Sequence, residues 1–148
     1  MNKQPTYNIR KAQSNDVENF HEAVCSSNNI KEDIINFEQR FKQMLRSKSY
    51  LFFILEAVPK KVVGCTVLEI RKNLISPSPF LEIETFYIDP KYRKWKAAEF
   101  LYKEIEQNVK QLMFFKLKVN CNMNSTLNQN FYTKKGFKIS KKQYEKDL

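Results

Sequence analysis

A positively charged turn between a predicted strand and a predicted helix is the first part of this chain whose residue types indicate binding chemistry. It runs from Asp89 to Ala98 and reads DPKYRKWKAA. The first amide groups of a helix have no partners within the helix, and the helix dipole favours an anion there. Arg93, Lys94 and Lys96 add positive potential beside these amides. The turn is therefore expected to bind phosphate groups, and a solvated, lysine-rich helix start is the alternative.

Two carboxylates precede this turn on the same predicted strand. Residues two apart on a strand point to the same side, so Glu82 and Glu84 are expected to share a face with Phe86 and Ile88. Unpaired charge buried on that face would be costly, so the face should open onto a cleft or water. A carboxylate at the floor of such a cleft can act as a general base. Pairing with nearby lysines on an exposed strand is the alternative, and it is the simpler interpretation for Glu82.

The stretch IDPKYRKWKAAEFL, residues 88–101, resembles the acetyl-CoA-binding segment of the GNAT superfamily of acyl-CoA N-acyltransferases. In that family an apolar strand end is followed by x-Pro-x-Tyr-Arg and by the loop [Arg/Gln]-x-x-Gly-x-[Gly/Ala]. Here Arg93 fills the first loop position and Ala98 the last, whereas Lys96 stands where the first glycine is usual. A second family signature, aromatic-Tyr-x-x-x-Gly-Phe, is matched by FYTKKGF at residues 131–137.

The resemblance implies specific roles for residues of this chain, with acetyl-CoA as co-substrate and no metal. Tyr132 corresponds to the tyrosine that protonates the departing thiolate, and an aromatic packed under a short helix is the alternative. Glu84 corresponds to the general base of some members. Asn124, or its neighbour Ser125, corresponds to the asparagine that contacts the pantetheine arm. The implied cofactor-binding residues are Phe86, Tyr87, Ile88, Arg93, Lys94, Trp95, Lys96, Ala97, Ala98, Asn124 and Tyr132.

The elements that must position these residues are predicted from hydrophobic periodicity and from turn residues. Helices are expected over about 14–26, 31–47, 97–110 and 126–135, and strands over 7–12, 50–57, 62–71, 80–88, 114–120 and 137–140. The early glycine of the third strand, Gly64, indicates a close backbone approach or a bulge. The resemblance implies a GNAT-like α/β (α+β) fold. It has a mixed, mostly antiparallel sheet of six to seven strands, flanked by about four helices, in one domain spanning residues 1–148.

Composition limits the partners and the compartment. The chain has 148 residues and a net charge of +10, which favours an anionic partner such as nucleic acid, a lipid surface or coenzyme A. The aromatic residues fall mostly at core-like spacing, which argues against nucleic-acid binding as the function. Three separated cysteines form no disulfide or metal pattern, and no secretory signal or membrane span is found, which predicts a cytoplasmic protein. The single histidine, His21, is expected to be structural, and Cys121 is given no role.

The resemblance to the GNAT superfamily implies an N-acetyltransferase that moves an acetyl group from acetyl-CoA to a primary amine by direct attack in a ternary complex. The pantetheine would pair with the backbone of Tyr87 and Ile88, and the Ile88 amide would polarise the thioester carbonyl. A catalytically inactive, GNAT-like acyl-CoA-binding module is the first alternative, and a basic nucleic-acid-binding protein is the second. The acceptor stays open among polyamines, amino acids, aminoglycosides and protein amines, and the resemblance also allows a homodimer.

Overall fold

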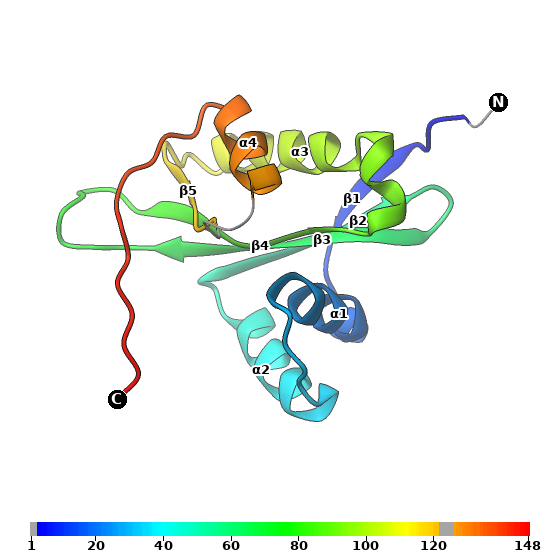
Figure 1. Ribbon diagram of the computed structural model, residues 1–148, viewed down its shortest axis with the longest axis horizontal. Helices are drawn as coiled ribbons and strands as arrows, with labels where there is room; N and C mark the ends of the chain where they lie inside the picture. The colour runs from blue at the N-terminus through cyan, green and yellow to red at the C-terminus, as the bar shows by residue number, and fades with distance from the viewer. Residues whose placement is uncertain (1–2, 122–125) are drawn as a thin grey trace.

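Five strands form one sheet in the order β1-β2-β3-β4-β5, as the computed structural model shows for the described residues 3–121 and 126–148 (Figure 1). Neighbouring strands from β1 to β4 are antiparallel, and β5 runs parallel to β4. The strands are β1 (Tyr7–Lys11), β2 (Tyr50–Ala57), β3 (Lys61–Arg71), β4 (Phe80–Ile88) and β5 (Leu117–Val119). The sheet is therefore mixed and mostly antiparallel, as predicted.

Four α-helices cover the two faces of this sheet. They are α1 (Val17–Asn28), α2 (Ile34–Arg46), α3 (Ala97–Gln111) and α4 (Thr126–Lys134), with short 3₁₀ helices η1 (Ser14–Asp16) and η2 (Pro90–Trp95). Figure 1 shows α1 and α2 on one face and α3 and α4 on the other. Among the described helices, none is both long and apolar enough to cross a membrane.

The strand count differs from the prediction, because the described residues form five strands and not six or seven. The strand expected over 114–120 is shortened at its start, since the Phe114 amide still donates to the Val109 carbonyl at the end of α3 (3.1 Å). The strand expected over 137–140 is not formed. Residues 138–148 are exposed, and they have no ladder partner in the described part of the chain.

Each face of the sheet has its own hydrophobic core. On the α1/α2 face the rings of Phe20, Phe41 and Phe52 pack with centroids 5.2–5.4 Å apart. On the α3/α4 face, Leu101 and Ile105 of α3 are fully buried against β2, β3 and β4. The alternation of apolar residues along β2 supplies both cores, which fixes the sheet between its two helical layers.

Candidate active site

The pairing between β4 and β5 is short, and this leaves much of one edge of β4 open. Only Leu81, Glu82 and Ile83 pair with β5, opposite Leu117–Val119. The remaining residues of β4, from Glu84 to Ile88, have no ladder partner on that side among the residues that the structure describes. β4 is therefore open along the part that leads to the basic turn, where the sequence analysis expected the pantetheine to pair.

The register between β3 and β4 determines which backbone groups face the open edge. The Asp89 amide donates to the Val63 carbonyl (2.8 Å), and Ile88 lies opposite Gly64. Because hydrogen-bonded and non-hydrogen-bonded pairs alternate in an antiparallel ladder, the N–H groups of Ile88 and Phe86 point away from β3. The backbone groups of Tyr87 point toward Cys65 instead. The amides available to a ligand are therefore those of Phe86 and Ile88, and the predicted backbone pairing with Tyr87 does not fit this register.

A β-bulge in β4 corrects the predicted arrangement of side chains. Leu68 pairs with Ile83 and Val67 pairs with Thr85, so Glu84 is an extra residue without an opposite partner. A bulge shifts the alternation of faces by one residue. As a result Phe86 packs with the α3/α4 core, together with Ile83. The expectation that Glu82, Glu84, Phe86 and Ile88 share one face is wrong, because it assumed a regular strand.

The bulge is held in place by a buried hydroxyl that the sequence analysis did not identify. Thr66 is fully buried, and its Oγ1 donates to the carbonyl of Thr85, next to Glu84 (2.8 Å). A buried hydroxyl requires a partner, and here it satisfies a carbonyl beside the irregular position. Nothing in the local sequence distinguishes Thr66 from other β-branched strand residues.

Glu84 is exposed on the bulge, and other acidic groups lie near it. Removal of surrounding water by the protein raises the pKa of its carboxyl, and the charges of Glu69 and Glu82 raise it further. The charge of Glu84 also acts on the phenol of Tyr50. Tyr50 packs against the α1/α2 core. A carboxylate with a raised pKa in an open position is a better base than an ordinary glutamate.

Glu82, in contrast, has structural partners. Its Oε2 accepts from Nη1 of Arg71 at 3.0 Å, and its Oε1 accepts from Nδ2 of Asn120 at 2.6 Å. These contacts tie β3 and the residue after β5 to β4. Glu82 is therefore paired, as the structural interpretation expected. Its partners are Arg71 and Asn120 and not lysines, and it is buried and not on an exposed strand surface.

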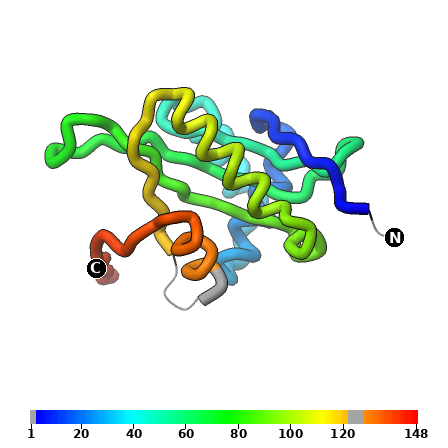
Figure 2. The backbone as a smooth tube through the Cα atoms, turned by 90° about the horizontal axis from the view of Figure 1, so that it is seen from above, coloured from blue at the N-terminus to red at the C-terminus, as the bar shows by residue number. Residues whose placement is uncertain are grey.

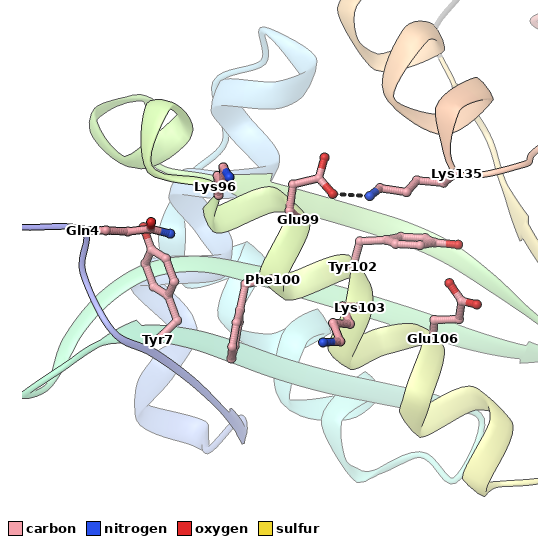
Figure 3. A pocket seen from close by; sticks show the side chains of 9 residues that line it. All are labelled: Gln4, Tyr7, Lys96, Glu99, Phe100, Tyr102, Lys103, Glu106 and Lys135. Carbon is pink, nitrogen blue, oxygen red and sulfur yellow. Dashed lines mark hydrogen bonds and ion pairs between the residues drawn. The ribbon is translucent and has the colours of Figure 1, made fainter.

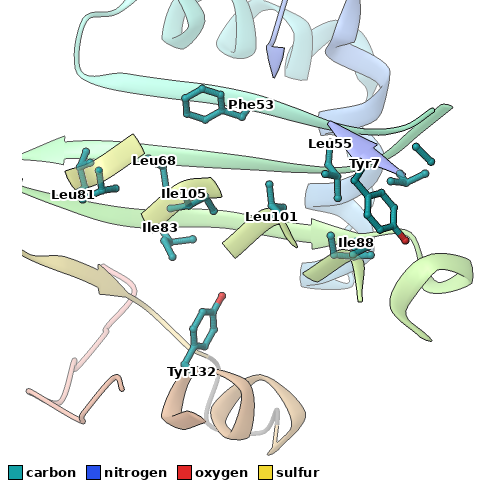
Figure 4. Close-up of a cluster of buried hydrophobic side chains, with 14 residues drawn as sticks. Tyr7, Phe53, Leu55, Leu68, Leu81, Ile83, Ile88, Leu101, Ile105 and Tyr132 are labelled. Atoms are coloured by element: carbon teal, nitrogen blue, oxygen red, sulfur yellow. The ribbon is translucent and has the colours of Figure 1, made fainter. Parts of the chain in front are cut away.

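Tyr132 approaches β4 from the opposite face of the sheet. It is 9% exposed, and its ring packs edge-on against Phe86 of β4 and Phe137 after α4 (centroids 6.4 and 5.4 Å apart). Figure 4 shows its hydroxyl pointing from α4 toward the sheet near Ile83. Burial, followed by nearby Cys121 and Tyr102, raises the pKa of the phenol, so Tyr132 is protonated at neutral pH. Both the predicted donor and the predicted core role fit this placement.

The basic turn has the backbone shape that a glycine would favour, although lysine occupies the position. Lys96 joins η2 to α3 with φ 58° and ψ 24°, in the left-handed region. This conformation costs a residue with a side chain about 1–2 kcal/mol. Because of it, η2 ends and α3 begins within one residue, and the free amides of the first turn of α3 follow at Ala97 and Ala98.

Contacts from three directions hold this turn. Nε of Arg93 donates to the carbonyl of Ile88 (3.2 Å), which orients the end of β4 and partly occupies Arg93. The Trp95 carbonyl accepts from the Tyr7 hydroxyl (3.1 Å) and from the Gln4 amide (3.4 Å). The ammonium of Lys94 lies over the Trp95 ring, 5.1 Å from its centroid. The turn is thus anchored to β1 and β4, and the roles of Tyr7 and Gln4 were not apparent from the sequence.

Two shallow cavities adjoin the turn. One, of about 490 Å³, lies between α1 and the end of β4, and Tyr87, Asp89, Lys91 and Arg93 line part of it. The other, of about 410 Å³, runs along the outer side of α3 from Lys96 (Figure 3). Its lining residues are Gln4, Tyr7, Lys96, Glu99, Phe100, Tyr102, Lys103, Glu106 and Lys135. An ion pair between Glu99 and Lys135 crosses its edge. The sequence analysis did not predict this second groove.

Four further residues were considered in the sequence analysis. Asn124 and Ser125 lie outside the described residues. Nε2 of His21 is 2.7 Å from the Glu32 carbonyl, in the segment before α2, which confirms its structural role. The thiol of Cys121 is partly buried close to Tyr132, and burial raises its pKa.

The sequence matches the family described as "Acetyltransferase (GNAT) domain" over residues 10–148. The fold, the open edge of β4 and the turn before α3 agree with that match. The chain therefore belongs to the GNAT acetyltransferase family, and it is an acyltransferase. No match is found among curated proteins.

Solved structures with similar folds have low sequence identity to this chain. A transcriptional regulator from Bacillus halodurans C-125 has a TM-score of 0.84 at 15% identity, covering 97% of this chain and 100% of that chain. The aminoglycoside antibiotic 6'-N-acetyltransferase AAC(6')-Ih from Acinetobacter baumannii has a TM-score of 0.79 at 16% identity, with 97% and 99% coverage. AAC(6')-Iy, in complex with the bisubstrate analog CoA-S-monomethyl-acetylneamine, has a TM-score of 0.81 at 16% identity, covering 97% of this chain and 99% of that chain. At these identities the likeness shows the fold alone.

Proposed function

We propose that this protein transfers an acetyl group from acetyl-CoA to a primary amine by direct attack in a ternary complex. The observation that carries the proposal is the open edge of β4. There, the unpaired amides of Phe86 and Ile88 lie between the Glu84 bulge on one side and the turn before α3 on the other. An extended pantetheine arm matches such an edge, because it can pair with strand backbone.

The diphosphate of coenzyme A would bind at the first turn of α3. The amides of Ala97 and Ala98 lack partners within the helix, and Lys96 and Lys94 stand beside them. Lys96 keeps the left-handed backbone of the usual glycine and adds a charge that can meet a phosphate. The groove along α3, with Lys96, Lys103 and Lys135 among its lining residues, would receive the nucleotide end. Asn124 stays a candidate for the pantetheine arm.

Three groups of the chain would carry out the transfer. The Ile88 amide would donate to the thioester carbonyl and stabilise the oxyanion that forms when the amine attacks. Glu84, whose pKa is raised, would take the proton of the amine. Tyr132, which is protonated at neutral pH, would give its proton to the departing thiolate of coenzyme A. The C–N bond forms, the C–S bond breaks, and both protons have a defined destination.

The acceptor would approach from the α1/α2 side of β4. Burial and the charges of Glu69 and Glu82 raise the pKa of Glu84. Because Glu82 is paired with Arg71, Glu69 and Glu84 would supply most of the negative charge on this side, in a chain of net charge +10. A cationic amine is attracted to such a position and can lose its proton there. Aminoglycosides are the acceptors that the name of the similar AAC(6')-Ih gives, so they belong in any acceptor panel.

Release of free thiol from acetyl-CoA, measured with a panel of small amines, amino acids, aminoglycosides and peptides, tests this function. Tyr132→Phe is expected to lower kcat by about a hundredfold, because general acid catalysis contributes factors of this size. The ring of Tyr132 stays in place in this variant, so calorimetry should show unchanged binding of coenzyme A. Full turnover by Tyr132→Phe would remove the tyrosine from the mechanism. Binding of coenzyme A without thiol release by any acceptor would favour a non-catalytic module.

A further inference from the structure

The C-terminal segment, residues 138–148, is basic, and no contact within the described chain holds it. It reads KISKKQYEKDL, and all of its residues are exposed. No hydrogen bond or ion pair joins any of them to another described residue. Lys141 and Lys142 stand next to each other in this segment. Their side chains carry primary amines, which is the acceptor chemistry that the proposed function requires.

The segment starts close to the proposed site of transfer. Phe137, the residue before it, donates its amide to the Tyr132 carbonyl (3.1 Å), and the two rings have centroids 5.4 Å apart. The Tyr132 ring in turn packs against Phe86 of β4, with centroids 6.4 Å apart. The base of the segment is therefore fixed two ring contacts away from the open edge of β4.

The path of the segment leads to the side from which the acceptor would approach. Figure 1 shows it beginning beside α4 and ending at the level of α2, so it passes from the α3/α4 side of the sheet to the α1/α2 side. Figure 2, seen from above, places it beside α4, on the same side of the molecule as β5. Lys141 and Lys142 lie four and five residues beyond Phe137, so each has a tether of about 13–18 Å at about 3.3–3.6 Å per extended residue. Glu84 is two residues from Phe86 on β4, about 7 Å along the strand, a separation that these tethers and the lysine side chains can span.

We propose that the protein acetylates its own C-terminal segment, with Lys141 or Lys142 as the acceptor in the active site of the same chain. This inference rests on the proposed function and assigns one acceptor to it. The lysine pair carries positive charge, and Glu69 and Glu84 carry negative charge on the side where the segment ends. Opposite charges favour the encounter, and a short tether holds the amine at an effective concentration on the order of millimolar.

The transfer has the same balance as with any primary amine. The neutral amine of the lysine attacks the thioester carbon, the C–N bond forms and the C–S bond breaks. The proton of the nitrogen goes to Glu84, and Tyr132 gives its proton to the departing thiolate. Acetyl-CoA is the only co-reactant. Acetylation removes the positive charge of the lysine, so each chain releases at most one thiol for each of the two lysines and then stops.

Incubation with acetyl-CoA and no added amine, followed by peptide mapping in a mass spectrometer, tests this proposal. Lys141 or Lys142 is expected to gain an acetyl group at least about tenfold faster than Lys61. Lys61 is also exposed, but it is fixed in β3 opposite Ala57. The rate per chain should stay unchanged when the protein concentration is raised about tenfold, because a tethered acceptor reacts within its own chain.

Two double variants and one single variant identify the acceptor and the catalyst. Lys141→Arg with Lys142→Arg keeps the charge of the segment but removes both acceptors, so thiol release without added amine should disappear, while turnover of small amines and binding of coenzyme A persist. Lys60→Arg with Lys61→Arg, at the β2–β3 turn, is the matched control and should leave this release unchanged. Tyr132→Phe should slow acetylation of the segment by about a hundredfold, which separates the enzymatic reaction from a spontaneous one.

Failure of this inference is distinguishable from failure of the proposed function. Thiol release with an added amine but no acetyl group on Lys141 or Lys142 overturns the inference and leaves the proposed function standing. A rate per chain that rises in proportion to protein concentration also overturns it, because the acceptor then belongs to another chain. So does acetylation of the segment at the full rate in a Tyr132→Phe protein whose turnover of small amines has fallen, because the active site then takes no part. Absence of thiol release with every acceptor, the segment included, overturns both.

Discussion

At the scale of single residues, Lys96 and Glu84 hold positions that are unfavourable for folding but suited to the proposed chemistry. Lys96 is in the left-handed region, and Glu84 lies on a bulge beside other carboxylates. Local cost of this kind is often found at functional sites. Substitutions that remove each of these local costs should raise stability but weaken coenzyme A binding or lower turnover.

Lys96→Gly is expected to raise the free energy of unfolding by about 0.5–1 kcal/mol. Glycine adopts positive φ freely, and this gain exceeds its larger loss of chain entropy. Met113→Gly is the matched control, because Met113 also has a positive φ (64°) but lies after α3, away from the turn. Both variants should gain stability in chemical denaturation, and only Lys96→Gly should weaken coenzyme A in calorimetry. Equal affinity for coenzyme A in the intact protein, Lys96→Gly and Met113→Gly would show that the Lys96 charge does not contact a phosphate.

Glu84→Gln is expected to lower kcat by about a hundredfold and to abolish the acid limb of the kcat/KM profile. In the intact enzyme that limb should lie above the ordinary glutamate pKa of 4.5, because the pKa of Glu84 is raised. The folded state therefore holds this proton more tightly than the unfolded chain does, and stability falls as pH rises through the interval between the two pKa values. At neutral pH the variant should consequently melt at a higher temperature than the intact protein.

Glu69→Gln provides the comparison for Glu84. It removes one of the charges that raise the pKa of Glu84, without changing the predicted base. Its acid limb should shift to lower pH and its kcat should stay close to that of the intact enzyme. A Glu84→Gln protein with an unchanged pH profile would assign the limb to another group.

At the scale of elements, the close contact between β3 and β4 positions the open edge. An added Cβ at Gly64 would lie 2.6 Å from the Tyr87 carbonyl and 2.9 Å from Cδ1 of Ile88. The sequence indicated a close approach or a bulge here, and both occur, because the register also shifts next to Gly64, between Leu55 and Glu56. Glycine thus allows β4 to lie against β3 at Ile88, whose amide faces the open edge.

Gly64→Ala is expected to lower the free energy of unfolding by about 2 kcal/mol or more, since overpacking against backbone cannot be relieved by a rotamer change. Turnover should fall by more than the loss of folded protein explains, because Ile88 must move. Gly136→Ala is a useful comparison: nothing lies within 4 Å of its added Cβ, and only its φ of +92° opposes the change. Equal effects of the two substitutions on turnover would contradict the role given to the β3–β4 contact.

At the scale of the whole molecule, the protein's positive and negative side chains lie at different proposed substrate sites. In the proposed function, the net charge of +10 and the lysines around the start of α3 would attract coenzyme A, whereas Glu69, Glu82 and Glu84 would lie where the amine approaches. Long-range attraction of this kind is weakened by salt.

The KM for acetyl-CoA is therefore expected to rise several-fold when ionic strength increases from about 0.05 M to about 0.5 M, as screening shortens the Debye length. Dephospho-coenzyme A, which lacks the 3′-phosphate, should compete with a weaker salt dependence. Initial rates at several salt concentrations measure both effects. Salt-independent KM values would show that local contacts, not net charge, govern binding.

Much of the fold was predictable because the local signals agree with the final packing. The strands at 50–57 and 80–88 begin and end where their apolar residues and turn residues predict, and α3 follows its three- to four-residue period. The loop motif from Arg93 to Ala98 identified the start of α3, since its residue types are those that fit the backbone conformation of a turn into a helix. Lys96, which stands where the motif usually has glycine, has a positive φ, a conformation that glycine adopts more readily.

The amino-acid sequence by itself determined the order of the elements, the family and the candidate groups Glu84 and Tyr132, because these depend on residue types at short spacing. Only the tertiary structure decided which face each group takes, since the bulge at Glu84 arises from pairing with β3 and not from local preference. Within the described residues, it also gave residues 137–140 no strand partner. A strand needs a neighbour to complete its hydrogen bonds, and no sequence pattern fixes where that neighbour comes from.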